Sequence, residues 1–200
     1  MTASQAGQPG RPDPVRPDPG RPDPVRPDPG REVVLSLGSN VGDRLENLRR
    51  AVSLLCADGQ LGCAAVSGVY ETDPVGGPPQ DDYLNAVLLA VTALPGPEIL
   101  RRGQAAEAAL ARVRAQRWGP RTLDVDVITC GGEVSTDPAL TLPHPRAAER
   151  AFVLVPWLEI EPDAVVPGRG RVADLLAAIG PAGVRRVPGA VLQLPGPESR

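Results

Sequence analysis

The order of the predicted elements, β-α-β-β-α-β over residues 32–180, indicates an α+β protein with a ferredoxin-like sandwich, in which helices pack on an antiparallel sheet. Three observations predict this class. Short runs rich in Val and Leu indicate strands, and segments whose apolar residues recur at helical spacing indicate helices. Turns rich in Gly and Pro separate these strands and helices. The chain has 200 residues. Without its first 30 it keeps about 170, which is enough to bury a core without disulfides or metal ions.

Each element follows from a local pattern. Strands are expected where Val and Leu dominate a short run, and a helix is expected where Leu45, Leu48, Val52 and Leu55 share one face. Gly96-Pro97-Glu98 is typical of a helix start, because proline fits the first turn. In chain order these patterns predict a strand at 33–39, a helix at 43–57, strands at 63–72 and 83–94, a helix from 96 to about 115, a strand at 123–129, a short edge strand at 133–134, a short helix at 152–158 and a last helix at 172–179.

Three segments do not fit this pattern. Residues 11–30 repeat Arg-Pro-Asp-Pro-Val and Arg-Pro-Asp-Pro-Gly, with balanced charge and little to bury, so we expect residues 1–31 to form a disordered tail. A dispensable tail is the favoured interpretation and a docking role the alternative. Residues 181–200 are set apart as a C-terminal extension. The proline- and glycine-rich loop at 73–82 is long for a compact domain, and such loops are usually functional.

Charge and cysteine content restrict the function. All 21 basic residues are arginine, so a Walker A phosphate loop and lysine-based chemistry are excluded. The net charge of −3 argues against nucleic-acid binding, and no apolar run approaches the ~18 residues that a membrane helix needs. Cys56, Cys63 and Cys130 lack metal-ligand spacing, so we expect buried free thiols in a cytoplasmic protein.

The strongest chemical signal is the pair Asp124 and Asp126. On a strand their side chains point to the same face, whereas their apolar neighbours point to the core. Two adjacent carboxylates repel each other unless a cation compensates, and a hard ion such as Mg²⁺ suits them. The alternative is a solvated strand face on which Arg121 pairs with a carboxylate.

Arginines precede this pair. Arg112, Arg114, Arg117 and Arg121 lie at the end of the second helix and in the loop after it, where bidentate guanidinium groups suit a polyphosphate. The alternative is a basic helix end favoured by the helix dipole, which accounts for Arg112 and Arg114 alone.

Two further segments offer ligand-binding groups. His144, the only histidine, is flanked by prolines and followed by Arg146 and Arg150, which could bind phosphate. Tyr83 and Asn85 could stack on a flat heterocycle and hydrogen-bond its edge.

Together these separated segments resemble the 6-hydroxymethyl-7,8-dihydropterin pyrophosphokinases of the folate pathway in order and spacing. The resemblance covers roughly residues 32–180. It implies the ferredoxin-like fold and transfer of pyrophosphate from ATP to the hydroxymethyl group of a pterin, with release of AMP. The matching segments are Gly38-Ser39-Asn40, residues 70–74, Tyr83-Leu84-Asn85, residues 117–126, Pro143-His144-Pro145 and residues 150–154.

The resemblance also implies individual roles. Asp124 and Asp126 would hold two Mg²⁺ ions on the ATP phosphates and act with Arg112 and Arg121 as the catalytic set. The implied ATP-binding residues are Glu107, Arg112, Trp118, Arg121, Val127, Thr141, His144 and Arg150. The implied pterin-binding residues are Thr72, Asp73, Pro74, Tyr83, Asn85 and Phe152, with the rings of Tyr83 and Phe152 on either side of the pterin.

Two positions depart from the family pattern: residues 114–117 are one residue shorter than in a member used for comparison, and Ala139 replaces a basic residue. Another Mg²⁺-dependent nucleotidyl or phosphoryl transferase is the alternative function, because Asp-x-Asp with arginines serves many phosphate reactions. An RNA-binding module would need exposed aromatics in a basic strand, which the sequence lacks. The expectation is a monomeric cytoplasmic enzyme whose partners are ATP and hydroxymethyldihydropterin, with no nucleic acid and no membrane.

Overall fold

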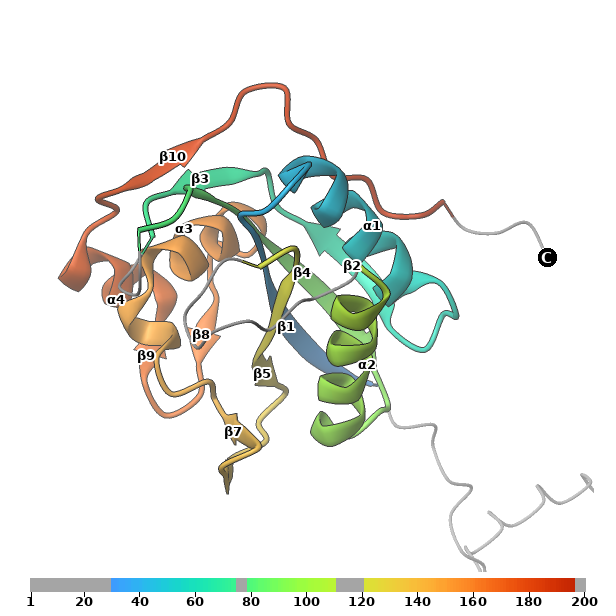
Figure 1. The fold of residues 1–200 in the computed structure, drawn as a ribbon. Helices are drawn as coiled ribbons and strands as arrows, with labels where there is room; N and C mark the ends of the chain where they lie inside the picture. The colour runs from blue at the N-terminus through green and yellow to red at the C-terminus, as the bar shows by residue number, and fades with distance from the viewer. Residues whose placement is uncertain (1–29, 75–78, 111–120, 197–200) are drawn as a thin grey trace, which may run out of the picture.

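A computed structural model describes residues 30–74, 79–110 and 121–196. Its centre is a six-stranded antiparallel sheet with helices on both faces (Figure 1). The strands run in the order β10-β3-β4-β1-β5, and β2 also pairs with β4. These strands are β1 (Arg31–Ser39), β2 (Gly62–Val66), β3 (Tyr70–Thr72), β4 (Tyr83–Thr92), β5 (Asp124–Cys130) and β10 (Val184–Arg186).

The predicted strand at 63–72 is divided into β2 and β3, both of which pair with β4. Ser67 marks the break: its backbone N–H donates to the Val87 carbonyl and its hydroxyl accepts the Val87 N–H. With β2 and β3 taken as one interrupted strand, the order is that of the ferredoxin-like α+β fold, as the sequence predicted.

One face of the sheet is covered by α1 (Arg44–Cys56) and α2 (Gly96–Ala109). Asp43 caps α1 by accepting the backbone N–H of Glu46 at 3.0 Å, which satisfies an end group of the helix. The apolar stripe predicted for α1 is buried in the larger core cluster together with Leu35 and Leu37 of β1. The predicted continuation of α2 to residue 115 lies outside the described residues.

The other face is covered by α3 (Ala151–Ile160), against which α4 (Val172–Ile179) packs, so helices lie on both sides of the sheet (Figure 1). Trp157 of α3 packs in a second core cluster with Val34 and Val87 of the sheet. Three short elements connect β5 to α3: β6 (Ser135–Asp137), β7 (Leu140–Leu142) and the 3₁₀ helix η1 (Ala147–Glu149). The hairpin of β8 (Val165–Val166) and β9 (Gly170–Arg171) connects α3 to α4. The edge strand predicted at 133–134 is wrong, because β6 begins at Ser135.

The ends of the domain extend beyond the predicted boundaries. Arg31, assigned to the tail by the sequence, already pairs with Thr92 in the sheet. Residues assigned to the C-terminal extension form β10 and continue over the larger core cluster, in which Leu192 is buried. In the described part of the chain, no helix is both long and apolar enough to cross a membrane.

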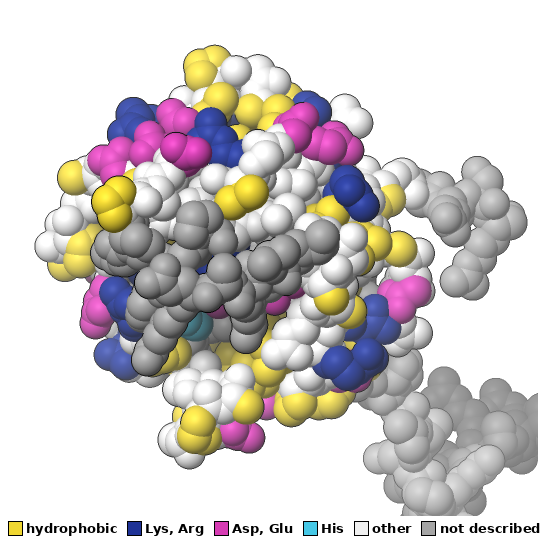
Figure 2. All heavy atoms as spheres, in the orientation of Figure 1, with side chains coloured by type: hydrophobic (Ala, Val, Ile, Leu, Met, Phe, Trp, Pro, Cys, Tyr) yellow, Lys and Arg dark blue, Asp and Glu magenta, His cyan; other side chains and the backbone are white. Residues whose placement is uncertain are grey.

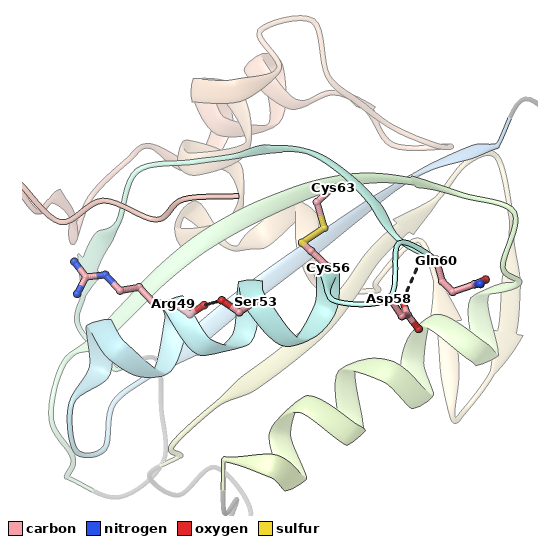
Figure 3. Close-up of a disulfide and its surroundings, with 6 residues drawn as sticks. All are labelled: Arg49, Ser53, Cys56, Asp58, Gln60 and Cys63. Atoms are coloured by element: carbon pink, nitrogen blue, oxygen red, sulfur yellow. Dashed lines mark hydrogen bonds between the residues drawn. A yellow bond between two sulfur atoms is a disulfide. The ribbon is translucent and has the colours of Figure 1, made fainter. Parts of the chain in front are cut away.

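The expectation of three free thiols is wrong for two of them. Cys56, at the end of α1, and Cys63, on β2, form a disulfide (Figure 3). Their Cα atoms are 5.9 Å apart because the chain turns back sharply between the helix and the strand. Cys130 is free and buried, as predicted. Burial, with a hydrogen bond to Glu133, raises the pKa of its thiol to about 11.

Candidate active site

The paired carboxylates lie on β5, the strand at the end of the sheet that pairs with β1. Asp124 and Asp126 are partly exposed and Val125 between them is buried, so the predicted alternation is observed. Gly38 of β1 lies opposite Asp124. A Cβ atom on Gly38 would lie 3.1 Å from the side-chain oxygen of Asn85, so glycine keeps open the space between β4 and β5.

Each carboxylate is paired with an arginine. The Arg121 guanidinium donates to Asp124, and Arg150 Nη1 lies 2.9 Å from Asp126 Oδ2. Burial opposes the charge on Arg121, but the neighbouring acidic groups, Asp124 first among them, outweigh it and raise its pKa. Each of the two negative charges is therefore balanced by a guanidinium group.

His144 lies beside this pair, with Nε2 3.9 Å from Asp126 Oδ2. Its backbone N–H donates to the Ile128 carbonyl, and its Nδ1 accepts the backbone N–H of Arg146 at 3.2 Å. Burial lowers the pKa of His144; Asp126 partly opposes this, and the nearby arginines reinforce it. The lowered pKa favours the neutral ring, and because Nδ1 accepts a hydrogen bond, the proton of the neutral ring lies on Nε2.

The opposite wall carries the aromatic and amide groups. Asn85 and Thr72 are buried on neighbouring strands, and the Asn85 amide donates to Thr72 Oγ1 at 2.7 Å. The Tyr83 hydroxyl donates to Gln80 Oε1 at 3.2 Å. Phe152 opens α3, and its ring centre lies 5.5 Å from the guanidinium carbon of Arg150, which joins the two walls.

These walls enclose one cavity of about 280 Å³, near the lower end of the range for small-ligand sites. Ten predicted site residues line it: Thr72, Asp73, Tyr83, Asn85, Arg121, Asp124, Asp126, His144, Arg150 and Phe152. Ser36, Gly38, Gln80 and Arg146 complete the lining. The structure therefore brings residues from the predicted ATP-binding set and from the predicted pterin-binding set into one cavity. These residues come from five separate segments of the chain.

Other predicted residues lie elsewhere. Glu107 is buried on α2, where it accepts the backbone N–H of Val125 at 2.9 Å. The Val127 side chain is in the larger core cluster, and the Thr141 hydroxyl donates to the backbone of β6. Pro74 belongs to the described part of the chain, but it does not line the cavity. Arg112, Arg114, Arg117 and Trp118 lie outside the described residues.

Asn40 holds the site together, a role that sequence reasoning missed. Its Oδ1 accepts the backbone N–H of Arg121 at 2.7 Å, and its own backbone N–H donates to the Arg121 carbonyl at 3.0 Å. Its amide nitrogen donates to Gln80 Oε1 at 3.0 Å and to the Asp81 carbonyl at 3.2 Å. Asn40 follows β1 within the Gly-Ser-Asn segment and is 3 % exposed, so these hydrogen bonds are shielded from water.

The donor set fits a magnesium ion carried with a substrate. Two carboxylates on one strand supply hard oxygen ligands, and substrate phosphates and water would complete the octahedron. Within the described residues, no three His, Cys, Asp or Glu side chains gather into a group that could hold a metal ion. Together, the fold and the cavity define an α+β enzyme of the class that transfers a phosphate-containing group.

The chain belongs to the 7,8-dihydro-6-hydroxymethylpterin-pyrophosphokinase (HPPK) family, whose model matches residues 34–162. A 2-amino-4-hydroxy-6-hydroxymethyldihydropteridine pyrophosphokinase of Mycobacterium tuberculosis is 50 % identical over 165 residues, covering 75 % of this chain and 85 % of the relative. The enzyme of the same name from Methylorubrum extorquens is 44 % identical over 153 residues, covering 76 % of this chain and 96 % of the relative.

Solved structures agree on the fold. A Plasmodium falciparum HPPK-DHPS structure matches with a TM-score of 0.59 at 12 % identity, covering 78 % of this chain and 49 % of that one. An HPPK-DHPS structure in complex with substrates matches with a TM-score of 0.58 at 11 % identity, covering 75 % of this chain and 43 % of that one. The chain thus spans less than half the length of these proteins, and the likeness concerns the fold alone.

Proposed function

We propose that this protein transfers the pyrophosphoryl group of ATP to the hydroxymethyl oxygen of 6-hydroxymethyl-7,8-dihydropterin, giving AMP and the pterin diphosphate, in folate biosynthesis. The observation that carries the proposal is the composition of one cavity: the carboxylate–arginine pairs line one wall, and Tyr83, Asn85 and Phe152 line the other. The names of the relatives agree with this reaction.

The aromatic wall suits the pterin. We place the ring between Tyr83 and Phe152, because aromatic faces stack on flat heterocycles. Asn85 and Thr72 would hydrogen-bond the polar edge of the ring, and their burial excludes water that would compete for those bonds. In the proposed orientation the hydroxymethyl group would face β5, whose carboxylates line the other wall of the cavity.

The charged wall suits the triphosphate. Asp124 and Asp126 would hold two Mg²⁺ ions, which when bound neutralise phosphate charge and orient the leaving group. Arg121, Arg150 and the Nε2–H of His144 would donate to phosphate oxygens. The Arg112, Trp118 and Thr141 roles in ATP binding remain predictions, as do those of Glu107 and Val127.

The chemistry then requires positioning rather than a covalent intermediate on the protein. The hydroxymethyl oxygen attacks the β-phosphorus in line and releases its proton to solvent. The new P–O bond forms as the bond from the β-phosphorus to the oxygen that bridges the α phosphate breaks, and AMP leaves with that oxygen. Fixed guanidinium groups in a partly enclosed cavity stabilise the charge that develops on the phosphoryl oxygens. We propose that the enzyme acts as a monomer, since one chain supplies both walls of the cavity. A cytoplasmic location remains an expectation from the sequence.

The test is a product assay on the full chain. Incubation with ATP, MgCl₂ and hydroxymethyldihydropterin should yield AMP and pterin diphosphate in equal amounts by mass spectrometry. Asp163→Asn, which changes an exposed carboxylate remote from the cavity, should leave the yield unchanged and serves as the control. ADP or free pyrophosphate as the nucleotide product would instead indicate another Mg²⁺-dependent transferase.

A further inference from the structure

Arg185 on β10 bridges the two ends of the loop at 73–82. Its Nη1 lies 3.0 Å from Asp73 Oδ1, and its Nη2 lies 3.1 Å from Asp82 Oδ2. The same Nη2 lies 3.9 Å from Glu71 Oε2 on β3. One guanidinium thus contacts three carboxylates. Figure 2 shows basic and acidic side chains side by side along the edge of the molecule where β3 and β10 lie.

The position of Arg185 is fixed by the sheet. In the antiparallel pairing of β10 with β3, Arg185 lies opposite Glu71, and the neighbouring pair is Val184 with Thr72. Arg44 of α1 secures the same loop end, since its Nη1 donates to the Asp82 carbonyl at 2.7 Å and to Glu71 at 3.2 Å. Both the side chain and the backbone of Asp82 are therefore anchored.

These ion pairs contribute little to global stability. The Arg185 side chain is 49 % exposed, and exposed pairs change a folding equilibrium only slightly. Asp73 first, and Asp82 and Glu71 after it, raise the pKa of Arg185, so the bridge keeps its charge. Without the guanidinium, Asp73 and Asp82 would repel each other across the base of the loop. The main effect of these ion pairs is therefore on the positions of the two loop ends, Asp73 and Asp82.

The loop ends lead directly into the aromatic wall. Asp73 and Gln80 line the cavity, and Tyr83 follows Asp82 in the chain. Displacing Asp82 displaces the ring that would stack on the pterin. We propose that Arg185 is a positioning residue that sets pterin affinity by holding the two loop ends together; this inference rests on the proposed function. The charged wall is formed by other segments, so the affinity for ATP should stay unchanged.

The test compares full-length Arg185→Gln with Arg186→Gln. Arg186 is the matched control, because it lies on the same strand and pairs at 2.8 Å with Glu159 of α3, away from the loop. An exposed ion pair changes an equilibrium constant by up to about fivefold. Arg185→Gln should raise the KM and the Kd for hydroxymethyldihydropterin about three- to fivefold, with the KM for ATP changed less than about twofold. Arg186→Gln should leave the pterin constants near their wild-type values.

Arg185→Lys keeps the test valid if Arg185→Gln fails to fold. An ammonium cannot span both loop ends as a guanidinium does, so it should recover only part of the pterin affinity. A second check is non-additivity: in Asp82→Asn the further change Arg185→Gln should have a smaller effect than in the wild type.

The results separate this inference from the proposed function. A wild-type protein that binds no hydroxymethyldihydropterin in calorimetry overturns both. A wild-type protein that binds it, with Arg185→Gln within threefold of that affinity or equally impaired for ATP, overturns the inference alone.

Discussion

Replacing Arg121 with Ala tests whether the charged wall acts on the reaction or only on stability. The side chain is 26 % exposed and donates to Asp124, itself 27 % exposed. The backbone of Arg121 is held independently by Asn40 through two hydrogen bonds, which the substitution leaves in place. The variant therefore removes a guanidinium from the cavity without releasing the chain segment that carries it.

The two effects differ in size. The pair is more enclosed than a surface ion pair but not fully buried, so its loss should lower the free energy of unfolding by about 1–2 kcal/mol. Loss of one fixed donor to the transition state should lower kcat by a factor of about 10²–10³, or ~3–4 kcal/mol. Arg121→Lys should recover only part of kcat, because an ammonium lacks the bidentate fork.

The assay measures AMP formation at saturating ATP, MgCl₂ and pterin, together with urea unfolding of each variant. Arg171→Ala is the control: Arg171 also pairs with a carboxylate, at 3.1 Å from Asp163, but both side chains are exposed and remote from the cavity. It should change neither quantity appreciably. A loss of kcat below tenfold in Arg121→Ala, with a clear loss of stability, would refute the catalytic interpretation and leave only the salt bridge.

Four further predictions follow from the same structure. Asp126→Ala should abolish AMP formation while circular dichroism stays native, since this partly exposed carboxylate supplies no core packing; near-normal turnover would contradict the metal assignment. Reducing the Cys56–Cys63 disulfide, which closes a loop with a sequence separation of 7, should lower the free energy of unfolding by about 2.5 kcal/mol; an unchanged urea midpoint would argue against it. Cys130, with its pKa raised to about 11, should resist alkylation at pH 8 until the protein is unfolded. The stability that the protonated Cys130 thiol contributes should be present below pH 9 and lost as the pH rises toward 11. A chain lacking residues 1–30 should keep its activity and melting temperature, which thermal unfolding and the AMP assay check together.

Local periodicity was enough to predict the main elements of the fold. The stripe of α1 and the alternation on β5 were both correct, because a helix or strand that buries one face repeats its apolar residues every few positions. The strand β10 escaped detection because its three residues, Val184–Arg186, include two arginines and lack a strand-like pattern. Its structure comes from pairing with β3, which is distant in the chain.

Sequence reasoning found residues of the site more readily than the contacts between them. The disulfide depends on the turn after α1, which brings Cys56 and Cys63 together. Asp58-Gly59 is typical of a turn, but that pattern does not specify how close the two cysteines lie. Asn40 was noticed only as part of a motif, although it joins Arg121 to the loop at Gln80. Such roles depend on burial and on partners far along the chain, and neither is visible before the chain is folded.

The two interpretations of Asp-x-Asp that the sequence left open are not exclusive. The ion pair of the structural alternative exists, between Arg121 and Asp124. That pair nevertheless lies in the wall of a cavity, beside a second pair of Arg150 with Asp126 and the neutral ring of His144. A solvated strand face would not gather a second arginine from a different element around the neighbouring carboxylate. The ion pairs balance the charge of the carboxylates, and the same guanidinium groups line the cavity in which we propose that phosphate binds.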